Sequence, residues 1–454
     1  MIPNSLFLRL NPWHAGAEPA LPAYYVHRHA EKRLRDWTDP GRVVVITGPR
    51  QSGKSTLMNW WIGHLLGSGQ AERDSLVYLN ADYIQLLELI SQPISLLDYL
   101  EALPRGCPRY LFIDEVQRLP EPGLVLKQLL DLGTGMQLVV SGSASLSIRS
   151  QAREHLAGRK LDLFLPPFSF SEIVAALPDL ADLSDAPLEE LKRQWPHRGQ
   201  QLTELTEKLA TVGGYPAVWL GGEESQDRLT ELFDTYVRRD IVDFLRVDNP
   251  APFNRLVRLL ALQVGSQVNK TTLAADAGVR VREIDRYLSM LADTHVALIV
   301  PPFFSNKRKE IVKSPKIFFL DSGFRNILMG QLGPLAQRPD RGALIENLVV
   351  SEMAKQMPPL AQQHFWRTQS GAEVDSVVVH RERLIATEIK SGSRPRGPSR
   401  GFWSFIRSYN PAQAFLISHD TFSIPEPGQP LFLPIPVFLL LLERILRDQR
   451  YARN

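Results

Sequence analysis

Short apolar runs alternate with longer amphipathic stretches through the first 165 residues. The runs at 42–46 (RVVVI), 76–80 (LVYLN), 110–114 (YLFID) and 137–141 (QLVVS) have the length and composition of buried strands. Helical periodicity follows the first run as far as Leu66. Strands that alternate with helices predict a parallel sheet covered by helices on both faces. The predicted fold class is therefore α/β.

Beyond residue 165 the pattern changes three times. Residues 166–250 are helical and polar, with an interruption at 213–216 (GGYP), and we expect them to form a helical lid. Residues 251–325 predict three helices followed by a hairpin. From 326 to 454, strand-like and helical segments alternate again. Together with a core at 1–165, the sequence predicts four domains.

Composition excludes several classes of protein. A chain of 454 residues is too long for one hydrophobic core, and 44% apolar with 22% charged residues excludes disordered and fibrous proteins. The single cysteine, Cys107, excludes an intramolecular disulfide and suits a reducing compartment. The first ten residues lack a secretory pattern, and the most apolar stretch, 431–442, is shorter than the ~20 residues needed to span a bilayer. We therefore expect a cytoplasmic protein with no membrane partner.

The segment after the first apolar run fits the pattern G-x-x-x-x-G-K-[ST] and lies directly between a strand and a helix. Its glycines allow backbone N–H groups to surround phosphate oxygens, and the helix N-terminus adds a favourable dipole. We expect Lys54 to reach the β- and γ-phosphates of ATP and Ser55 to hold Mg²⁺. The predicted nucleotide-binding residues are Gly48, Pro49, Arg50, Gln51, Ser52, Gly53, Lys54, Ser55 and Thr56.

A later apolar run ends in two acids, Asp114 and Glu115. In NTPases with this pattern the first acid binds the metal, and the second orients and polarises the attacking water. The next run leads to Ser143, which is either a sensor of the γ-phosphate or an ordinary turn serine. Three arginines follow, any of which could stabilise transition-state charge in a neighbouring subunit. They are Arg149, Arg153 and Arg159, of which Arg159 is the best placed.

Residues 251–313 are the electropositive part of a nearly neutral chain. They hold ten Lys or Arg and five Asp or Glu, a local +5 in a chain of net charge +3. A short helix, a turn at Gly278 and a second helix at 281–293 have helix-turn-helix spacing, and residues 306–309 predict a basic wing tip. We expect a winged helix that binds DNA; the alternative is one that packs between subunits. The predicted DNA contacts are Arg280, Arg282, Arg286, Lys307, Arg308 and Lys309.

The C-terminal region carries acids in the pattern of PD-(D/E)xK nucleases. Asp375 and Glu388 would chelate Mg²⁺, and Glu346 would complete the metal shell from a helix. Lys390 would position or deprotonate the nucleophile. Such a domain either cleaves DNA or docks DNA without cleaving it, and we favour docking. Further predicted DNA contacts, in a stretch without acids, are Arg394, Arg396 and Arg400.

In their order along the chain, these motifs resemble a large prokaryotic family of AAA+-type ATPases with a C-terminal domain long classed as of unknown function. The resemblance covers nearly the whole chain, and its carriers are TGPRQSGKST, LFIDEVQRLP, SGSAS, LAGRK, GGYP at 213–216, RRDIV at 238–242, FLDSG at 319–323 and GALIEN at 342–347. It implies a P-loop AAA+ core, a helical lid, a winged helix and a restriction-endonuclease-like α/β domain. ATP and Mg²⁺ are the implied cofactors, and a homo-oligomeric ring, a hexamer, is the expected assembly.

The expected function is ATP hydrolysis coupled to translocation on DNA or to remodelling of duplex or branched, Holliday-type DNA. The branched-DNA expectation rests on resemblance to junction-processing AAA+ machines and to resolvase-like folds. Two alternatives stay open. One is an ATP- and Mg²⁺-dependent nuclease in defence or repair; the other is a signalling or scaffold ATPase that nucleotide switches without any DNA motor activity.

Overall fold

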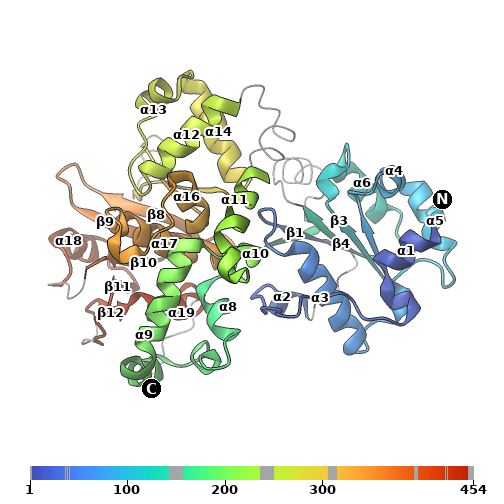
Figure 1. Ribbon diagram of the computed structural model, residues 1–454, viewed down its shortest axis with the longest axis horizontal. Coiled ribbons are helices and arrows are strands. Elements are labelled where there is room, and N and C mark those ends of the chain that lie inside the picture. The colour runs from blue at the N-terminus through green and yellow to red at the C-terminus, as the bar shows by residue number, and fades with distance from the viewer. Residues whose placement is uncertain are drawn as a thin grey trace. The chain divides into compact units, whose positions relative to one another are not determined.

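The computed structural model forms two compact units, Met1–Pro166 and Pro167–Asn454, and each is described by itself. The residues described are 3–35, 37, 39, 41–142, 156, 158–235, 250–304, 314–392, 397–424, 426 and 428–447. Figure 1 shows the helices and strands of both units along the chain.

Unit 1 is built on a five-stranded parallel sheet. Its strands are β1 (Val43–Thr47), β2 (Leu76–Asn80), β3 (Tyr110–Asp114), β4 (Gln137–Gly142) and β5 (Lys160–Phe164). Their spatial order is β2-β3-β4-β1-β5, and every neighbouring pair is parallel. The α/β prediction and the four predicted strands are confirmed, whereas β5 was not anticipated.

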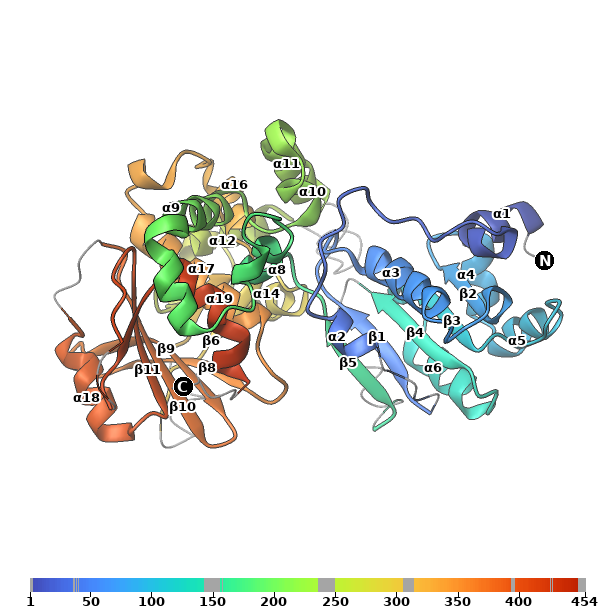
Figure 2. The same ribbon diagram turned by 90° about the horizontal axis from the view of Figure 1, so that it is seen from below.

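Successive residues of these strands face two separate cores, as the pleat of a β-strand requires. On one face Val44 and Ile46 pack with Trp61 of α3 (Lys54–Gly67). On the other face Val43 and Val45 pack with residues of α4 (Ile84–Ile90), α5 (Pro93–Glu101) and α6 (Pro122–Asp131). Figure 2 shows α3 and α6 on opposite sides of the sheet. The N-terminal elements α1 (Asn4–Leu10), η1 (Pro12–Ala15) and α2 (Glu31–Leu34) complete the two cores.

Unit 2 begins with helices and continues into a small hairpin. The first helices are α8 (Phe170–Ala175), α9 (Leu188–Val212), α10 (Pro216–Trp219) and α11 (Ser225–Thr235). Next come α12 (Pro250–Leu262), α13 (Lys270–Ala277), α14 (Val281–Asp293) and the antiparallel strands β6 (Ala297–Val300) and β7 (Lys316–Phe319). Gln267, before α13, forms an isolated bridge with Lys316 of β7. The helix expected at 281–293 has the predicted bounds.

The C-terminal part of unit 2 contains a second, mixed sheet. After α16 (Ser322–Met329) its elements are α17 (Arg341–Lys355), β8 (Gln362–Arg367), β9 (Glu373–His380), β10 (Arg383–Ile389), α18 (Arg400–Tyr409), β11 (Gln413–Ser418), β12 (Leu431–Pro434) and α19 (Ile435–Leu446). The spatial order is β12-β11-β10-β9-β8. Strands β8, β9 and β10 are antiparallel, whereas β10, β11 and β12 are parallel. Figure 2 shows α18 and α19 on opposite sides of this sheet.

The apolar C-terminal stretch folds into α19, whose residues Val437–Leu442 are all buried within unit 2. A short apolar helix of this kind is a core element. Within the described ranges, no helix combines the length and the apolar character needed to cross a membrane.

One hydrophobic cluster runs through the three sequence segments that make up unit 2. It contains Tyr215 of the first helices, Leu288 of α14, Phe318 of β7 and Phe365 of β8. Two of the motifs also meet directly: Gly214 donates its N–H to Asp321 Oδ2 at 2.7 Å. A Cβ on Gly213, whose φ is +80°, would lie 2.0 Å from the same carboxylate, so this turn requires glycine. The described parts of these segments pack as one body.

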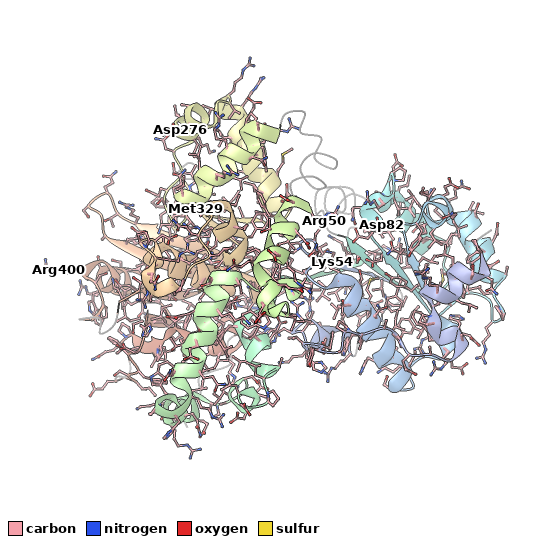
Figure 3. All side chains as sticks on the ribbon, viewed as in Figure 1. Arg50, Lys54, Asp82, Asp276, Met329 and Arg400 are labelled. Atoms are coloured by element: carbon pink, nitrogen blue, oxygen red, sulfur yellow. The ribbon has the colours of Figure 1, made fainter. Side chains whose placement is uncertain are left out.

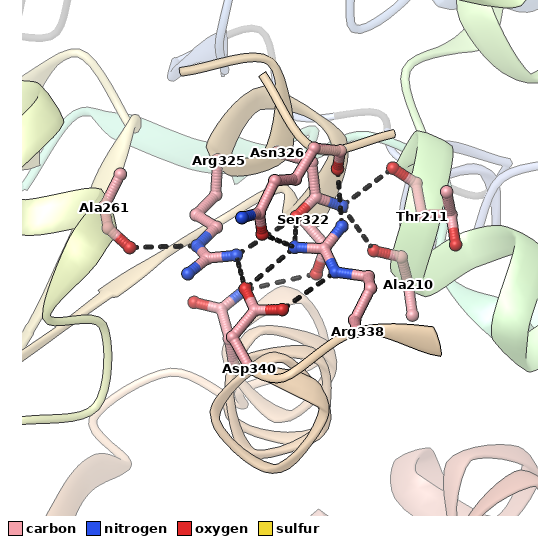
Figure 4. Close-up of polar contacts among 10 residues, drawn as sticks. Ala210, Thr211, Ala261, Ser322, Arg325, Asn326, Arg338 and Asp340 are labelled. Atoms are coloured by element: carbon pink, nitrogen blue, oxygen red, sulfur yellow. Dashed lines mark hydrogen bonds and ion pairs between the residues drawn. The ribbon is translucent and has the colours of Figure 1, made fainter. Parts of the chain in front are cut away.

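A buried polar network also connects the segments of unit 2 (Figure 4). Arg325, 1% exposed, donates to the Ala261 carbonyl at 3.0 Å and forms an ion pair with Asp340. Arg338 lies 2.8 Å from Asp340 and 3.0 Å from Asn326 Oδ1. The Asn326 amide donates to two carbonyls at the end of α9. The network therefore ties α9, α12, α16 and the start of α17 together.

Candidate functional site

The loop at 48–53 joins the end of β1 to the start of α3 and is wrapped around Lys54. Lys54 Nζ donates to the carbonyls of Gly48, at 3.2 Å, and Pro49, at 2.8 Å, and the side chain is buried. A Cβ on Gly48 would lie 2.1 Å from the Leu165 carbonyl oxygen, so only glycine fits there. Gly53, just before the helix, has a φ of +95°. The glycines of the motif thus serve close backbone approach and a left-handed turn.

Arg28 supports this loop, and its part was not anticipated from the sequence. Its guanidinium donates to the Ser52 carbonyl at 2.9 Å and to the Pro166 carbonyl at 2.6 Å. The side chain is buried. One arginine therefore joins the loop to the last residue of unit 1. Arg28 lies well before the motif in the sequence, so no local pattern indicated this role.

Asp114 ends β3 and is fully buried between two hydroxyl groups. Tyr78, on the neighbouring strand β2, donates to Oδ2 at 2.6 Å, and Ser141 of β4 hydrogen-bonds to Oδ1. Burial, followed by the charge of Asp114, raises the pKa of the Tyr78 phenol, so this hydroxyl remains a donor. The predicted sensor, Ser143, lies outside the described residues. Ser141, two residues earlier, contacts the acid.

Glu115 follows with a left-handed φ of +56°, and Gln117 donates its amide to Glu115 Oε2. Burial raises the pKa of the Glu115 carboxyl, and the nearby Lys54 ammonium lowers it in part. Asp82 acts on the same carboxyl as a further negative charge. Figure 3 shows Lys54 and Asp82 at the same end of unit 1's sheet. Lys54, Asp114 and Glu115 therefore share one site at the carboxyl edge of the parallel strands.

This site offers suitable groups for a magnesium nucleotide. Ser55 is exposed at the start of α3, and its hydroxyl and the Asp114 carboxylate are the hard oxygen donors that Mg²⁺ prefers. The Ser52 hydroxyl is buried and has no hydrogen-bond partner among the described residues. It is available as a donor to a phosphate oxygen. The residues present therefore fit Mg²⁺ and a nucleotide.

Arg159 lies at the amino-terminal end of the same parallel strands. Its carbonyl accepts from Val43 N–H at 2.9 Å, at the start of β1, and its guanidinium is 2.6 Å from Asp131. Both side chains of this ion pair are exposed. Arg159 is therefore at the opposite end of β1 from the P-loop. The other two arginines, Arg149 and Arg153, lie outside the described residues.

The exposed face of α14 carries arginines, whereas its other face is core. Ile284, Leu288 and Leu291 are buried, and Arg282 and Arg286 are exposed. Among the described residues, neither guanidinium forms an ion pair. Arg280, just before the helix, and Arg400, at the start of α18, are also exposed (Figure 3 labels Arg400). Of the other predicted DNA contacts, Lys307, Arg308, Lys309, Arg394 and Arg396 fall outside the residues that the structure describes.

Four acids on α17, β9 and β10 form what we refer to as the carboxylate cluster: Glu346, Glu373, Asp375 and Glu388. Asp375 Oδ2 accepts from Ile389 N–H at 2.7 Å, which joins β9 to β10. Glu388 accepts from Ser399 N–H at 2.9 Å and pairs with Lys390 at 2.8 Å. The structure thus brings Asp375 next to the E-x-K strand, as predicted.

The remaining predicted ligand, Glu346, is bound to a cation that the sequence did not suggest. Lys316 Nζ lies 2.9 Å from Glu346 and 2.6 Å from Glu373. Burial and the charge of Glu346 raise the pKa of Asp375 to about 7. Among the described residues, no three His, Cys, Asp or Glu side chains converge as metal ligands. The carboxylates in this arrangement therefore do not form the predicted Mg²⁺ site.

Three family models match parts of the chain. Residues 40–174 match an AAA domain. Residues 203–334 match a domain of unknown function, DUF8612, and residues 341–438 match a second one, DUF4143. With the P-loop and the parallel sheet, the first match supports an ATPase domain of AAA type in unit 1.

Some curated relatives match about four fifths of this chain. An uncharacterized protein of Mycobacterium tuberculosis is 29% identical over 374 residues, which cover 81% of this chain and 74% of that protein. An uncharacterized protein of Methanocaldococcus jannaschii is 24% identical, with 80% and 76% covered. Among solved structures, the Aeropyrum pernix ORC1 protein in complex with DNA is 15% identical with a TM-score of 0.31, covering 68% of this chain and 94% of that one. C. elegans PCH-2 has a TM-score of 0.24 at 13% identity, with 42% and 49% covered.

Proposed function

We propose that this chain is an AAA-type ATPase that hydrolyses ATP in unit 1 and uses the reaction to act on DNA. The observation that carries the proposal is the grouping of Lys54, Asp114 and Glu115 at one edge of a parallel sheet. The charges of Lys54 and Asp114 both act on the Glu115 carboxyl, so a lysine, a metal-ligand acid and a second acid share one site. That set is what phosphoryl transfer to water requires.

Each residue has a role that follows from its position. The loop N–H groups and Lys54 bind the phosphates, and Ser55 and Asp114 hold Mg²⁺, which neutralises phosphate charge. Tyr78 and Ser141 orient Asp114 through their hydrogen bonds. Glu115 positions the attacking water and accepts its proton. Because Gln117 holds Glu115 through its amide, the Glu115 side chain is already directed by its neighbours.

DNA binding is proposed for the segment from α12 to β7. Its order of three helices and a hairpin, with a Gln267–Lys316 bridge, supports a winged-helix domain. Arg280, Arg282 and Arg286 are exposed, and they would contact phosphates or base edges. The proposed work is translocation on duplex DNA or remodelling of a branched junction. The mixed sheet with Asp375 beside Glu388 and Lys390 supports a restriction-endonuclease-like domain that docks DNA.

A ring of identical subunits, a hexamer, is the proposed assembly. Arg159 lies at the amino-terminal end of β1, whereas the P-loop of the same subunit follows the carboxyl end of that strand. Arg159 would therefore complete the catalytic site only of a neighbour. Its present partner, Asp131, is exposed, and exposed ion pairs of this type are worth only ~0–1 kcal/mol. The guanidinium is therefore easily redirected towards another subunit.

The proposed DNA contact is tested by fluorescence anisotropy with labelled duplex and four-way junction DNA. Arg282→Glu/Arg286→Glu reverses the charge of the α14 face, and we expect it to weaken binding of both DNAs at least about tenfold. A matched control, Lys192→Glu/Arg193→Glu, changes the same charge on the exposed surface of α9 and should leave binding unchanged. Equal affinities for all three proteins would remove α14 from the DNA interface. Intact nucleotide-dependent assembly without DNA binding would favour the signalling ATPase.

A further inference from the structure

The carboxylate cluster already contains a cation that belongs to the protein. Lys316 is the first residue of β7, and its ammonium contacts Glu346 of α17 and Glu373 of β9 at 2.9 and 2.6 Å. Its side chain is 5% exposed, although lysine is rarely buried without partners. The ammonium also lies 5.3 Å from the centre of the Phe365 ring, within the range of a cation–π contact. Each of these contacts keeps the charge in the cluster.

The charges explain why the lysine stays there. Two carboxylates within 3 Å of one buried ammonium hold it in place and compensate its charge. Without that positive charge, Glu346, Glu373 and Asp375 would repel one another in a partly desolvated space. One ammonium bridging two carboxylates thus has the electrostatic role that a bound metal ion has in an acidic site.

The space around Glu346 is also restricted. Gly265 has a φ of +74°, and a Cβ at this position would be 3.2 Å from Glu346 Oε2. Its N–H is bonded to the Ile317 carbonyl at 3.0 Å, so the loop before α13 is fixed against β7. Mg²⁺ usually keeps several water molecules in its coordination shell. A hydrated ion has little room beside Glu346 while Lys316 and Gly265 are there.

We propose that Lys316 is the resident cation of the carboxylate cluster and occupies the place of a divalent ion, so that Mg²⁺ or Mn²⁺ binds to the cluster only when this side chain is withdrawn. Lys316 comes from the hairpin of the proposed winged helix and not from the mixed sheet that carries Glu373 and Asp375. The Lys316 side chain can therefore be replaced without changing any of the acids that it contacts. In the arrangement described, the C-terminal sheet does not carry out metal-dependent cleavage.

The test is Mn²⁺ binding to the full chain without nucleotide, measured by the loss of the free-ion electron paramagnetic resonance signal. Wild-type protein should show no Mn²⁺ binding that depends on Glu346. Lys316→Met keeps the length and apolar contacts of the side chain, and it should gain one Mn²⁺ site per chain. Adding Glu346→Gln should remove the new site. Lys390→Met, which removes the lysine paired with Glu388, should gain none.

Two results would overturn the proposal. The first is Mn²⁺ binding by wild-type protein that is lost in Glu346→Gln while Lys316 is intact. This comparison does not depend on the stability of any Lys316 variant. If wild-type protein shows no Glu346-dependent Mn²⁺ binding, the proposal is supported. The second is a Lys316→Met protein with the wild-type circular dichroism spectrum that gains no site. Both readouts are independent of ATP turnover, so the inference stands or fails separately from the proposed ATPase.

Discussion

Tyr78 and Asp114 are joined across neighbouring strands by a hydrogen bond of 2.6 Å between the phenolic hydroxyl and carboxylate Oδ2. The bond is buried at the carboxyl edge of the parallel sheet, where β2 and β3 lie side by side. The Ser141 hydroxyl donates a hydrogen bond to the other carboxylate oxygen, Oδ1. The proposed metal-binding acid is therefore oriented by two hydroxyls.

Replacing Tyr78 with phenylalanine should lower ATP turnover about tenfold and raise the Mg²⁺ concentration needed for half-maximal rate. The loss corresponds to about 1.5 kcal/mol, the value of one hydrogen bond to a charged group. Steady-state turnover across a Mg²⁺ titration measures both quantities. Tyr110→Phe is the control, because Tyr110 lies at the opposite end of β3. An unchanged Mg²⁺ dependence in Tyr78→Phe would contradict the orienting role.

Glu115→Gln should still bind ATP but hydrolyse it at least about 10²-fold more slowly, because the general base is lost while the phosphate contacts remain. Lys54→Ala should lose affinity for ATP itself. Equilibrium binding of a fluorescent ATP analogue and single-turnover hydrolysis separate the two effects. Glu121→Gln, at an exposed acid just before α6, is the matched control. Wild-type hydrolysis by Glu115→Gln would show that another group activates the water.

Arg28→Met should weaken ATP binding about tenfold, although Arg28 is distant from the motif in sequence. The change removes donors from the carbonyls of Ser52 and Pro166, and a buried acceptor left without its partner costs ~1–3 kcal/mol. Nucleotide titration and thermal unfolding measure the two consequences. Arg35→Met removes an exposed arginine from the same segment and should have little effect. If both variants bind ATP equally well, Arg28 does not support the loop.

Asp340→Asn should destabilise unit 2 by ~1.5–3 kcal/mol at neutral pH, because the buried Arg325 and Arg338 lose their hydrogen bonds to a shared carboxylate. The two guanidinium groups hold the pKa of Asp340 well below its usual range. A lowered folded-state pKa adds stability above the unfolded value of about 3.9, and this stability is lost as the pH falls below it.

Urea unfolding of wild type and Asp340→Asn at a series of pH values measures this contribution. The difference between their midpoints should be full above about pH 5 and shrink at more acidic pH. Asp182→Asn, which breaks an exposed pair with Arg198, should shift the midpoint little. A difference that stays constant with pH would mean that the charge of Asp340 is not the cause.

The sequence predicted those parts of the site that are set by local pattern. The P-loop and the strand that ends at Asp114 combine strong β-propensity with a glycine motif, so four strands of the first sheet and the helix at 281–293 were identified. The strand β5 was missed because its residues are only partly buried and its pattern is weak. Ser141, within β4, contacts Asp114. The sequence pattern pointed to Ser143 instead, which lies outside the described residues.

Contacts between distant segments were beyond the reach of sequence patterns. Tyr78 reaches Asp114 only because β2 and β3 are neighbours, and Arg28 reaches Ser52 from a segment without a motif. Lys316 reads as an ordinary strand residue until β7 and α17 are packed together. Its position changes the interpretation of Glu346 from a metal ligand to the partner of a lysine. Motifs indicate the chemistry available, but packing determines which partner each group has.

ATP turnover with no nucleic acid, duplex, single-stranded DNA and a four-way junction, each at two salt concentrations, tests the central claim most directly. We predict that at least one DNA form stimulates turnover and that the stimulation weakens at the higher salt, because phosphate contacts release counterions. The form that stimulates most identifies the preferred DNA. Turnover that no DNA form changes at either salt concentration would contradict a DNA-coupled ATPase and favour the nucleotide-switched signalling protein.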